Sequence, residues 1–387
     1  MNLTNNSTWV MTVNGTTPEW TVLPICLLLI FLTGIIGNGF LLVIFLTHRA
    51  LWSPFNVYVV NLLIGNCVYI AMQFPFDIYN NLYGGQWQLG NSVCTYYIAV
   101  SWCVQPIVFN SHQLIAVNRI WAVTHPISYR RLHSMRTAVA LSVGVWVYVL
   151  IGFAPGVIKD TLFFRMPVDG PDGCQLNVSA QFEWALTVGI IFNMWPQILM
   201  LLALVIIFVA RRTRHYRIRS NRRVNAVGPE NIAAFAEGND TITRRRTHSS
   251  GGNAIVLSSR SMSQPQTVDV PDSDQKVGGE NAAPDQERSP VDQQPVHRRR
   301  SHGDLLLILL TISVTICWTP NNIWLGWLFY GPIDSPIFTA TATILLALEA
   351  TIDPLMFAFA LGKLRIVVSN LWSRVNILKL NSRVYGI

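Results

Sequence analysis

Seven long apolar stretches, separated by shorter polar segments, constrain this 387-residue chain more than any other feature of its sequence. A helix of about 20 apolar residues crosses the hydrocarbon core of a bilayer, and helices of that kind satisfy every backbone polar group internally. The stretches are 21–46, 56–79, 93–121, 137–158, 184–209, 305–329 and 336–361. Charged residues make up only 12% of the chain, against roughly 25% in soluble domains. The sequence therefore predicts an all-α integral membrane protein, a seven-transmembrane helix bundle, and argues against an ordinary soluble enzyme.

Basic residues favour one side of the predicted spans. With the N-terminus outside, only Lys159 and Arg165 of the 28 lysines and arginines lie in outer loops. Positive charge gathers on the cytoplasmic side of membrane proteins, so we expect a multi-pass plasma-membrane protein with an extracellular N-terminus. Sequons for N-glycosylation on the same outer side occur at Asn2, Asn5, Asn6, Asn14 and Asn177.

The composition also predicts how the chain is divided. Residues 1–20 form an extracellular glycosylated N-terminus, 21–210 hold the first five spans and 304–361 hold the last two. The cytoplasmic segment 211–303 is rich in Ser, Gln, Pro and Gly without a hydrophobic period, which predicts disorder. Its arginine clusters adjoin membrane helices and indicate contact with lipid headgroups and a cytoplasmic partner, not with nucleic acid. Residues 362–387 are expected to form a cytoplasmic amphipathic helix and tail.

Short motifs occur in a fixed order along the seven spans. They are Gly37-Asn38, Asn61-Leu62, Asn118-Arg119-Ile120, Trp146 with Pro155, Pro196, Cys317-Trp318-Thr319-Pro320 and Asp353-Pro354. In this order they resemble the rhodopsin-like (class A) G-protein-coupled receptors, and most closely the amine receptors of the muscarinic and histamine kind. The resemblance implies a receptor that passes the signal of an extracellular small molecule to a heterotrimeric G protein, with arrestin as a further partner.

The resemblance also implies roles for individual residues. Cys94 and Cys174 match the extracellular disulfide of the family. Asn118, Arg119 and Ile120 match the motif that couples to the G protein. The residues that match the activation hinge are Trp318, Pro320, Asp353, Pro354 and Phe357. Retinal requires a lysine in the last span, and no span contains one in its interior, so retinal binding is excluded.

Two departures affect the polar interior. The family's usual aspartate in the second helix is Asn66 here, and its usual asparagine before the last proline is Asp353, so the two groups are exchanged. We expect Asn38, Asn66 and Asp353 to meet through water, because polar groups at membrane depth need partners. Glu349 lies one helical turn before Asp353, on the same face. Two carboxylates this close in a low dielectric predict a bound proton or sodium ion, with no other metal or cofactor.

The coupling motif also departs from the family. Asn118 stands where an acidic residue usually precedes the arginine, and Arg300 stands where some relatives have glutamate. These losses weaken the inactive state. Two tyrosines that usually support the active state are replaced by Leu204 and Phe357, which acts in the opposite direction. We expect appreciable basal activity.

The ligand site lacks the usual anchor for amines. The aspartate that holds the ligand ammonium in amine receptors is replaced by Ser101, so Asp77 and Glu183 are the alternative acids. The residues predicted to line the ligand pocket are Ser101, Trp102, Asp77, Trp318 and Trp324. Aromatic side chains suit a flat or cationic ligand.

Two other classes of protein remain open. A transporter would show repeated halves with midplane charges, and the chain has no evident repeat. A non-signalling scaffold is compatible with the altered coupling motif. An enzyme is not expected, because the chain has no GxSxG, HExxH or P-loop motif. His112 is the one histidine within a predicted span, where we expect it to be a packed hydrogen-bonding residue.

Overall fold

The computed structural model describes residues 17–168, 173–226, 302–330, 335–371 and 373. The first four predicted glycosylation sites, at Asn2, Asn5, Asn6 and Asn14, lie outside the described residues. So do 227–301, which make up most of the predicted cytoplasmic loop and include Arg300, and the tail 374–387.

Seven helices are long and apolar enough to cross a membrane, which confirms the predicted fold class. Their bounds are Val22–Thr47, Pro54–Leu82, Gly90–Thr124, Met135–Phe164, Ser179–Arg214, Leu305–Trp327 and Pro336–Ala360. The described part of the chain contains no strand.

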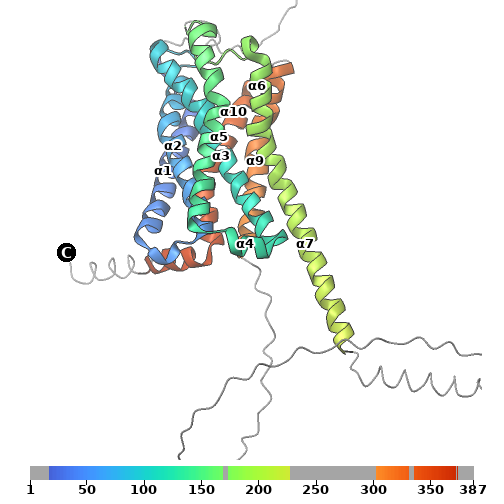
Figure 1. Ribbon diagram of the computed structural model, residues 1–387. Coiled ribbons are helices and arrows are strands. Elements are labelled where there is room, and N and C mark those ends of the chain that lie inside the picture. Colours follow the sequence, from blue (N-terminus) through green and yellow to red (C-terminus); the bar gives the residue numbers. More distant parts are fainter. Residues whose placement is uncertain (1–16, 169–172, 227–301, 331–334, 372, 374–387) are drawn as a thin grey trace, which may run out of the picture. The chain divides into compact units, whose positions relative to one another are not determined.

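The individual elements follow one another along the chain (Figure 1). They are α1 (Val22–Thr47), η1 (Arg49–Leu51), α2 (Pro54–Leu82), α3 (Gly90–Thr124), α4 (Pro126–Leu132), α5 (Met135–Lys159), η2 (Asp160–Phe164), η3 (Ser179–Gln181), α6 (Phe182–Val188), η4 (Gly189–Met194), α7 (Trp195–Ala226), α9 (His302–Tyr330) and α10 (Pro336–Ala360).

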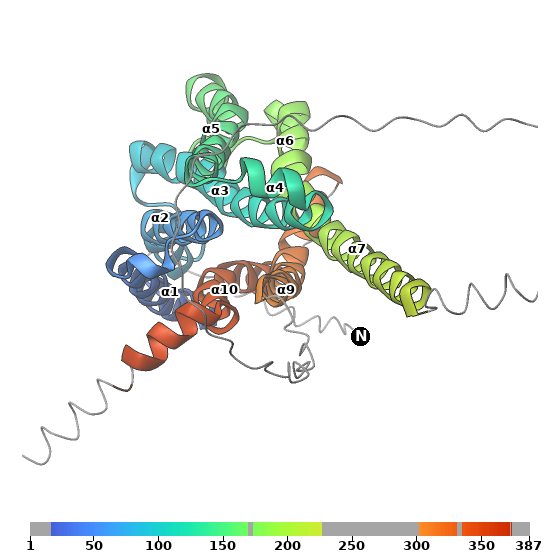
Figure 2. The same ribbon diagram turned by 60° about the horizontal axis from the view of Figure 1, so that its bottom comes forward.

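The bundle has two ends, which we name by their residues. The disulfide end carries the bond between Cys94 and Cys174, whose Cα atoms are 5.6 Å apart, and this confirms the predicted pairing. The Arg119 end carries Arg119 and α4, at the bottom of Figure 1. Helix α3 packs against α2, α5 and α9, while α1 packs against α2 and α10 (Figure 2).

Serine and proline define where three helices begin. The side chains of Ser53, Ser134 and Ser335 accept hydrogen bonds from backbone N–H groups in the first turns of α2, α5 and α10. Pro54 and Pro336 follow two of these caps, at positions where the missing N–H has no partner to lose.

Prolines and π-helical turns interrupt the regular helices. Pro155 lies in α5, five residues before the π-helical segment η2, and the π-helical segment η4 ends two residues before Pro196. Pro320 lies within α9 and Pro354 within α10. Pro75 within α2 and Pro106 within α3 are further interior prolines. Because proline removes a backbone donor and π-helical turns widen the helix, these are points at which the helices can bend.

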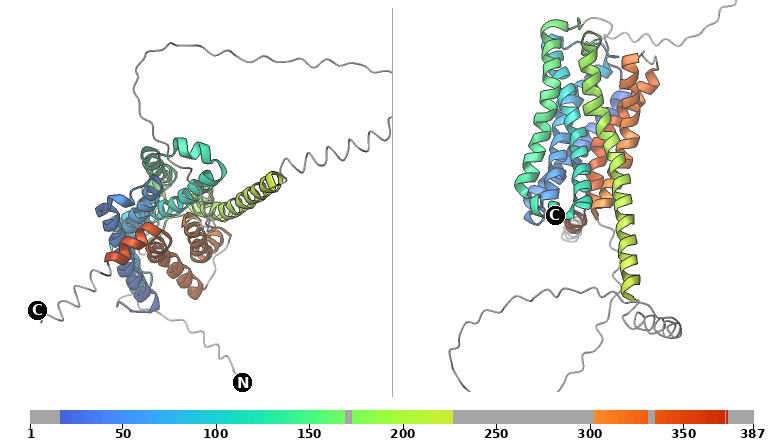
Figure 3. Two further views of the ribbon diagram at one scale, coloured as in Figure 1. Left: turned by 90° about the horizontal axis from the view of Figure 1, so that it is seen from below. Right: turned by 45° about the vertical axis from the view of Figure 1, so that its right-hand side comes forward.

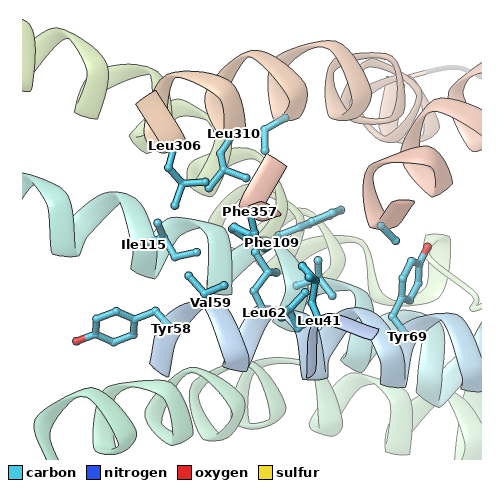
Figure 4. Packing of buried hydrophobic residues seen from close by; sticks show 14 of the residues in the cluster. Leu41, Tyr58, Val59, Leu62, Tyr69, Phe109, Ile115, Leu306, Leu310 and Phe357 are labelled. Atoms are coloured by element: carbon cyan, nitrogen blue, oxygen red, sulfur yellow. The ribbon is translucent and has the colours of Figure 1, made fainter. Parts of the chain in front are cut away.

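Apolar side chains fill the bundle between the two ends. Leu62 of α2, Ile115 of α3, Leu310 of α9 and Phe357 of α10 are each fully buried in one cluster (Figure 4). The cluster thus joins helices that are far apart in the sequence. Phe357, one of the predicted hinge residues, is therefore part of the packed core.

A polar contact links two of the family motifs. Asn61 of α2 donates to Ser111 Oγ of α3 at 2.8 Å, and the indole of Trp146 on α5 donates to Asn61 Oδ1 at 2.9 Å. A side chain that forms hydrogen bonds to two neighbouring helices at once holds those helices at a fixed position along the bundle axis.

A further helix, residues 362–371, follows α10 at the Arg119 end (Figure 3). Leu364 is buried against the bundle, and Lys363 and Arg365 are exposed, so the helix is amphipathic. Ile366 of this helix is 60% exposed, so its apolar side chain does not pack against the bundle.

Candidate functional site

A cavity of about 650 Å³ occupies the disulfide end of the bundle. Most of its lining residues come from α2, α3, α9 and α10 and from the segment that carries Cys174. Of the five residues predicted for the pocket, Asp77, Ser101, Trp102 and Trp324 line this cavity. Trp318 is not among the lining residues, because it is fully buried one layer further into the bundle.

Asp77 is the carboxylate of this cavity. The hydroxyl of Tyr97 on α3 donates to Asp77 Oδ1 at 2.7 Å. Gln73, one turn earlier on α2, and Ser101, one turn after Tyr97, also line the cavity, and the oxygens Gln73 Oε1 and Ser101 Oγ are buried without a hydrogen-bond partner. The wall therefore presents several acceptor oxygens and one carboxyl group. Glu183, the alternative acid, is exposed at the start of α6 and does not line the cavity.

No basic side chain of the described residues forms an ion pair with Asp77. The two basic residues predicted for the outer loops are used elsewhere or point outward. Arg165 lies 3.0 Å from the buried carboxylate of Asp160, and Lys159 is exposed. Asp77 is thus a cavity carboxylate whose counter-charge the described chain does not supply.

Asn177, the one predicted glycosylation site among the described residues, also lines the cavity. Its amide nitrogen donates to the carbonyl of Phe164 at 3.0 Å. A glycan would replace one of the two hydrogens on this nitrogen, and the other could still donate to the Phe164 carbonyl.

A second polar site lies deeper, where α1, α2, α3 and α10 meet. Asn66 donates to Asp353 Oδ2 at 2.8 Å and to Asn38 Oδ1 at 3.3 Å, and Asn38 donates to the carbonyl of Ala350 at 2.7 Å. The expected grouping of the two asparagines with Asp353 is present, but through direct hydrogen bonds, because the side chains approach closely enough to need no bridging water.

His112 completes this second site. Its Nε2 atom lies 3.1 Å from Asp353 Oδ1 and 3.4 Å from Glu349 Oε1, and all three residues are buried. We call His112, Glu349, Asp353 and Asn66 the polar cluster. Its four side chains come from α2, α3 and α10, so it ties three helices together at mid-depth.

A stack of rings connects the cavity with the polar cluster. Phe109 lines the cavity, and its ring centroid is 4.1 Å from that of the fully buried Trp318. Trp318 also meets the ring of His112 in a T-shaped contact, with the ring centroids 5.2 Å apart. The cavity, α9 and the polar cluster are therefore joined by direct ring contacts.

The predicted hinge at Pro320 is bridged to α7. Gln197 donates to Thr319 Oγ1 at 2.7 Å and accepts from Asn322 Nδ2 at 2.6 Å. Thr319 and Asn322 lie on either side of Pro320, whose backbone nitrogen carries no hydrogen to donate. The contact joins the part of α9 around Pro320 to the neighbouring helix, and the sequence analysis did not predict this contact of Gln197.

The predicted coupling motif, Asn118-Arg119-Ile120, lies at the Arg119 end. Asn118 is buried, accepts from the Tyr129 hydroxyl at 3.2 Å, and its amide lies 3.1 Å from His133 Nε2. The guanidinium of Arg119 lies over the ring of Phe55, 3.5 Å from its centroid. The motif is thus held between α2 and the short segment that carries α4.

Two groups near the motif have shifted pKa values. Burial lowers the pKa of His133 below its ordinary value, and the nearby charge of Arg119 lowers it further. This agrees with the hydrogen bonding, because the hydroxyl of Tyr58 and the amide of Asn118 both lie 3.1 Å from His133 Nε2 and both can donate to it. Burial raises the pKa of the Tyr129 hydroxyl, an effect that Arg119 opposes.

Comparison with known proteins decides the family. The model of the seven-transmembrane receptors of the rhodopsin family matches residues 37–357. This range includes every one of the seven spans in whole or in part. The chain belongs to the rhodopsin family of seven-transmembrane receptors.

Individual receptors of the rhodopsin family share only about a quarter of their residues with this chain, over about half of its length. Tyramine receptor 1 of Locusta migratoria is 26% identical over 232 residues, which cover 59% of this chain and 46% of that receptor. The alpha-2B adrenergic receptor of Mus musculus is 28% identical over 202 residues, which cover 51% of this chain and 43% of that receptor. The chain thus spans about half the length of the curated relatives it matches.

The sodium ion predicted from the sequence would have to bind within the polar cluster. His112 Nε2 already lies within 3.4 Å of oxygens of both carboxyl groups. The space beside Asn66 and Glu349 measures about 10 Å³, about the smallest volume that holds a water molecule. The ligand atoms of His112, Glu349 and Asp353 lie within 4.8 Å of one another, which is the spacing of a metal site. The residues present nevertheless do not fit an added sodium ion between the two carboxyl groups, because His112 Nε2 already lies within 3.4 Å of an oxygen of each.

His112 is the residue of this site that sequence analysis did not assign to it. It was expected to be a packed hydrogen-bonding residue, and its Nδ1 atom is indeed 3.0 Å from the carbonyl of Val108. The available signal was its position seven residues before Arg119, which is about two helical turns and the same face of α3. That spacing gives the depth of His112 but not the helix it meets.

Proposed function

We propose that this chain is a G-protein-coupled receptor of the plasma membrane that binds a small organic ammonium ion in the cavity at its disulfide end. The N-terminus and the disulfide end face the outside, and the Arg119 end faces the cytoplasm. The rhodopsin-family match and the relatives named as tyramine and adrenergic receptors support this assignment.

The observation that carries the proposal is Asp77, a carboxylate in an aromatic cavity without a basic partner among the described residues. A charged carboxylate that has lost part of its hydration favours a ligand of opposite charge that also donates hydrogen bonds. Trp102 and Trp324 supply ring faces that attract a cation as well. Asp77 on α2 then serves as the anchor that Ser101 on α3 cannot provide.

Ligand binding reaches the Arg119 end through the ring stack. A ligand that shifts Phe109 changes its packing on Trp318, and the bend at Pro320 lets the cytoplasmic half of α9 move. Asp353, Pro354 and Phe357 form the corresponding hinge of α10. A ligand with higher affinity for one arrangement shifts the population toward it. The G protein then binds at Asn118, Arg119 and Ile120.

The orientation rests on the distribution of charge. Exposed arginines at the Arg119 end include Arg131 and Arg136, and the helix 362–371 adds Lys363 and Arg365. These groups favour anionic headgroups of the cytoplasmic leaflet. An N-glycosidase should then reduce the apparent mass of the protein made in eukaryotic cells, and an unchanged mass in the wild type would count against glycans at Asn2, Asn5, Asn6 and Asn14.

The proposal includes signalling without ligand. Asn118 is neutral, so it offers no ionised oxygen to the guanidinium of the neighbouring Arg119. We expect second-messenger levels to differ between cells with and without the ligand-free receptor. Equal levels would contradict basal activity without touching the ligand site.

The test of the ligand site compares wild type with Asp77→Asn in cells exposed to tyramine, histamine, acetylcholine and small peptides. A charge-assisted hydrogen bond contributes about 1.5–3 kcal/mol, which corresponds to a roughly 10- to 150-fold loss of potency for the active ammonium compound. Glu183→Gln is the matched control, because it removes the exposed acid at the same end of the bundle.

Equal potency in the wild type and Asp77→Asn would refute the anchor. Arg119→Ala tests coupling separately: it should abolish the second-messenger response while radioligand binding persists. A response that survives Arg119→Ala would favour a route other than the coupling motif, and a wild type that binds ligand without any response would favour the scaffold.

A further inference from the structure

The polar cluster places a histidine side chain beside two buried carboxyl groups. Glu349 and Asp353 are 3% and 0% exposed, and a charged group at membrane depth is costly unless it is paired. Among the described residues, the one basic side chain within ion-pair distance of either is His112. The lysines and arginines of the described chain form no ion pair with them.

The hydrogen-bond geometry of His112 indicates its charge state. Nδ1 lies 3.0 Å from the carbonyl oxygen of Val108, which can only accept. Nε2 lies 3.1 Å from Asp353 Oδ1, which only accepts when ionised. A neutral imidazole has a single N–H, whereas the imidazolium has two. Both nitrogens face acceptors, so the imidazolium is the form that satisfies both contacts beside an ionised Asp353.

The other side chains around His112, Glu349 and Asp353 add no further charge to the site. Asn66 donates to the second oxygen of Asp353, and the edge-to-face ring of Trp318 contributes no charge. The other titratable groups near the pair are Cys317 of α9 and Tyr69 of α2, which are neutral in their ordinary states. The cluster therefore contains one cationic side chain and two acidic ones.

We propose that the His112 imidazolium is the resident cation of the Glu349–Asp353 pair, so that an internal ion pair ties α3 to α10 and the site takes no alkali-metal ion. The proposal concerns the interior of the bundle and does not depend on which ligand the cavity binds or on coupling to a G protein.

The first measurement is the melting temperature of the purified full-length chain as sodium chloride replaces N-methylglucamine chloride at constant ionic strength. The wild type should show no shift with sodium, because its own imidazolium fills the place between the carboxylates. A wild type that is stabilised specifically by sodium would overturn the proposal.

The second measurement repeats the titration on His112→Asn, which removes the cation and leaves a smaller amide donor. Sodium should now raise the melting temperature, since at ten times its dissociation constant a bound ion shifts the folding equilibrium about elevenfold. The gain should disappear in the double variant His112→Asn with Asp353→Asn. A His112→Asn protein that is indifferent to sodium would also overturn the proposal.

Two further variants keep the result interpretable. His125→Asn changes an exposed histidine at the end of α3 and should behave like the wild type in sodium. His112→Gln is the alternative if the asparagine variant does not fold. If neither folds, the wild-type titration alone still decides between an internal cation and a sodium site.

Discussion

Asp77 and Asp353 are carboxylates of the same helix bundle with opposite surroundings. Asp353 is fully buried, and side chains from α2 and α3 contact both of its oxygens. Asp77 lines a cavity of about 650 Å³ and receives a hydrogen bond from Tyr97, but no described basic side chain pairs with it. Where the fold supplies the counter-charge, the carboxylate holds helices together. Where the fold omits it, the carboxylate is available to a ligand.

The largest expected effect concerns stability. His112→Leu leaves Asp353 and Glu349 buried without their cation, which costs about 3–5 kcal/mol of folding free energy. Asp77→Asn should cost less than about 1 kcal/mol, because the amide oxygen still accepts from Tyr97. Melting temperatures of the two purified variants, without ligand, compare the sites directly. Equal losses would mean that both carboxylates are structural.

A second experiment moves the ligand carboxylate within the cavity. Ser101 lines the same wall as Asp77, one turn after Tyr97. Adding Ser101→Asp to Asp77→Asn should recover at least about tenfold of the lost ammonium affinity, which corresponds to about 1.4 kcal/mol. Competition binding with the active compound from the ammonium screen gives the number. No recovery would indicate that the position of the charge, and not its presence, determines binding.

A third experiment separates the cavity from the polar cluster. Phe109→Ala removes the ring between the cavity and Trp318. Coupling free energies between sites are commonly 1–3 kcal/mol, and we expect a loss near the lower limit, about fivefold in the ratio of signalling potency to binding affinity. Ligand binding and second-messenger assays on the same cells measure both terms. Parallel changes in the two would show that Phe109 acts only on binding.

The smallest effect is a pH dependence at the Arg119 end. The pKa of His133 is lowered, so the unfolded chain binds this proton more tightly than the folded one. The contribution of His133 to stability is therefore complete above its ordinary pKa of about 6.5 and declines as the pH falls below that value. Thermal melts of the wild type from about pH 8 to about pH 5 should show a decline that His133→Gln reduces. An identical decline in both proteins would assign it to other groups.

Several features were predictable either from local composition or from the order of motifs that the family shares. Helix 22–47 needs only its length of apolar residues to be recognised. The pairing of Cys94 with Cys174 followed from the order of motifs that the family shares, and the structure contains it. The choice between Asp77 and Glu183 did not follow in the same way. In the sequence both are acids near the end of a helix. Only the packing of α2 beside α3 shows that Asp77, and not Glu183, lines the cavity.

The sequence by itself determined the number of spans, the position of the prolines and the exchange of amide and carboxylate between Asn66 and Asp353, since each of these is a property of residues along one helix. Only the tertiary structure decided that His112 lies between Glu349 and Asp353 and that Trp318 lies beneath the cavity. The reason is geometric: the depth of a side chain in a helix follows from counting residues, whereas its partner depends on the rotation and distance of another helix. Hydrophobicity alone does not specify those two quantities.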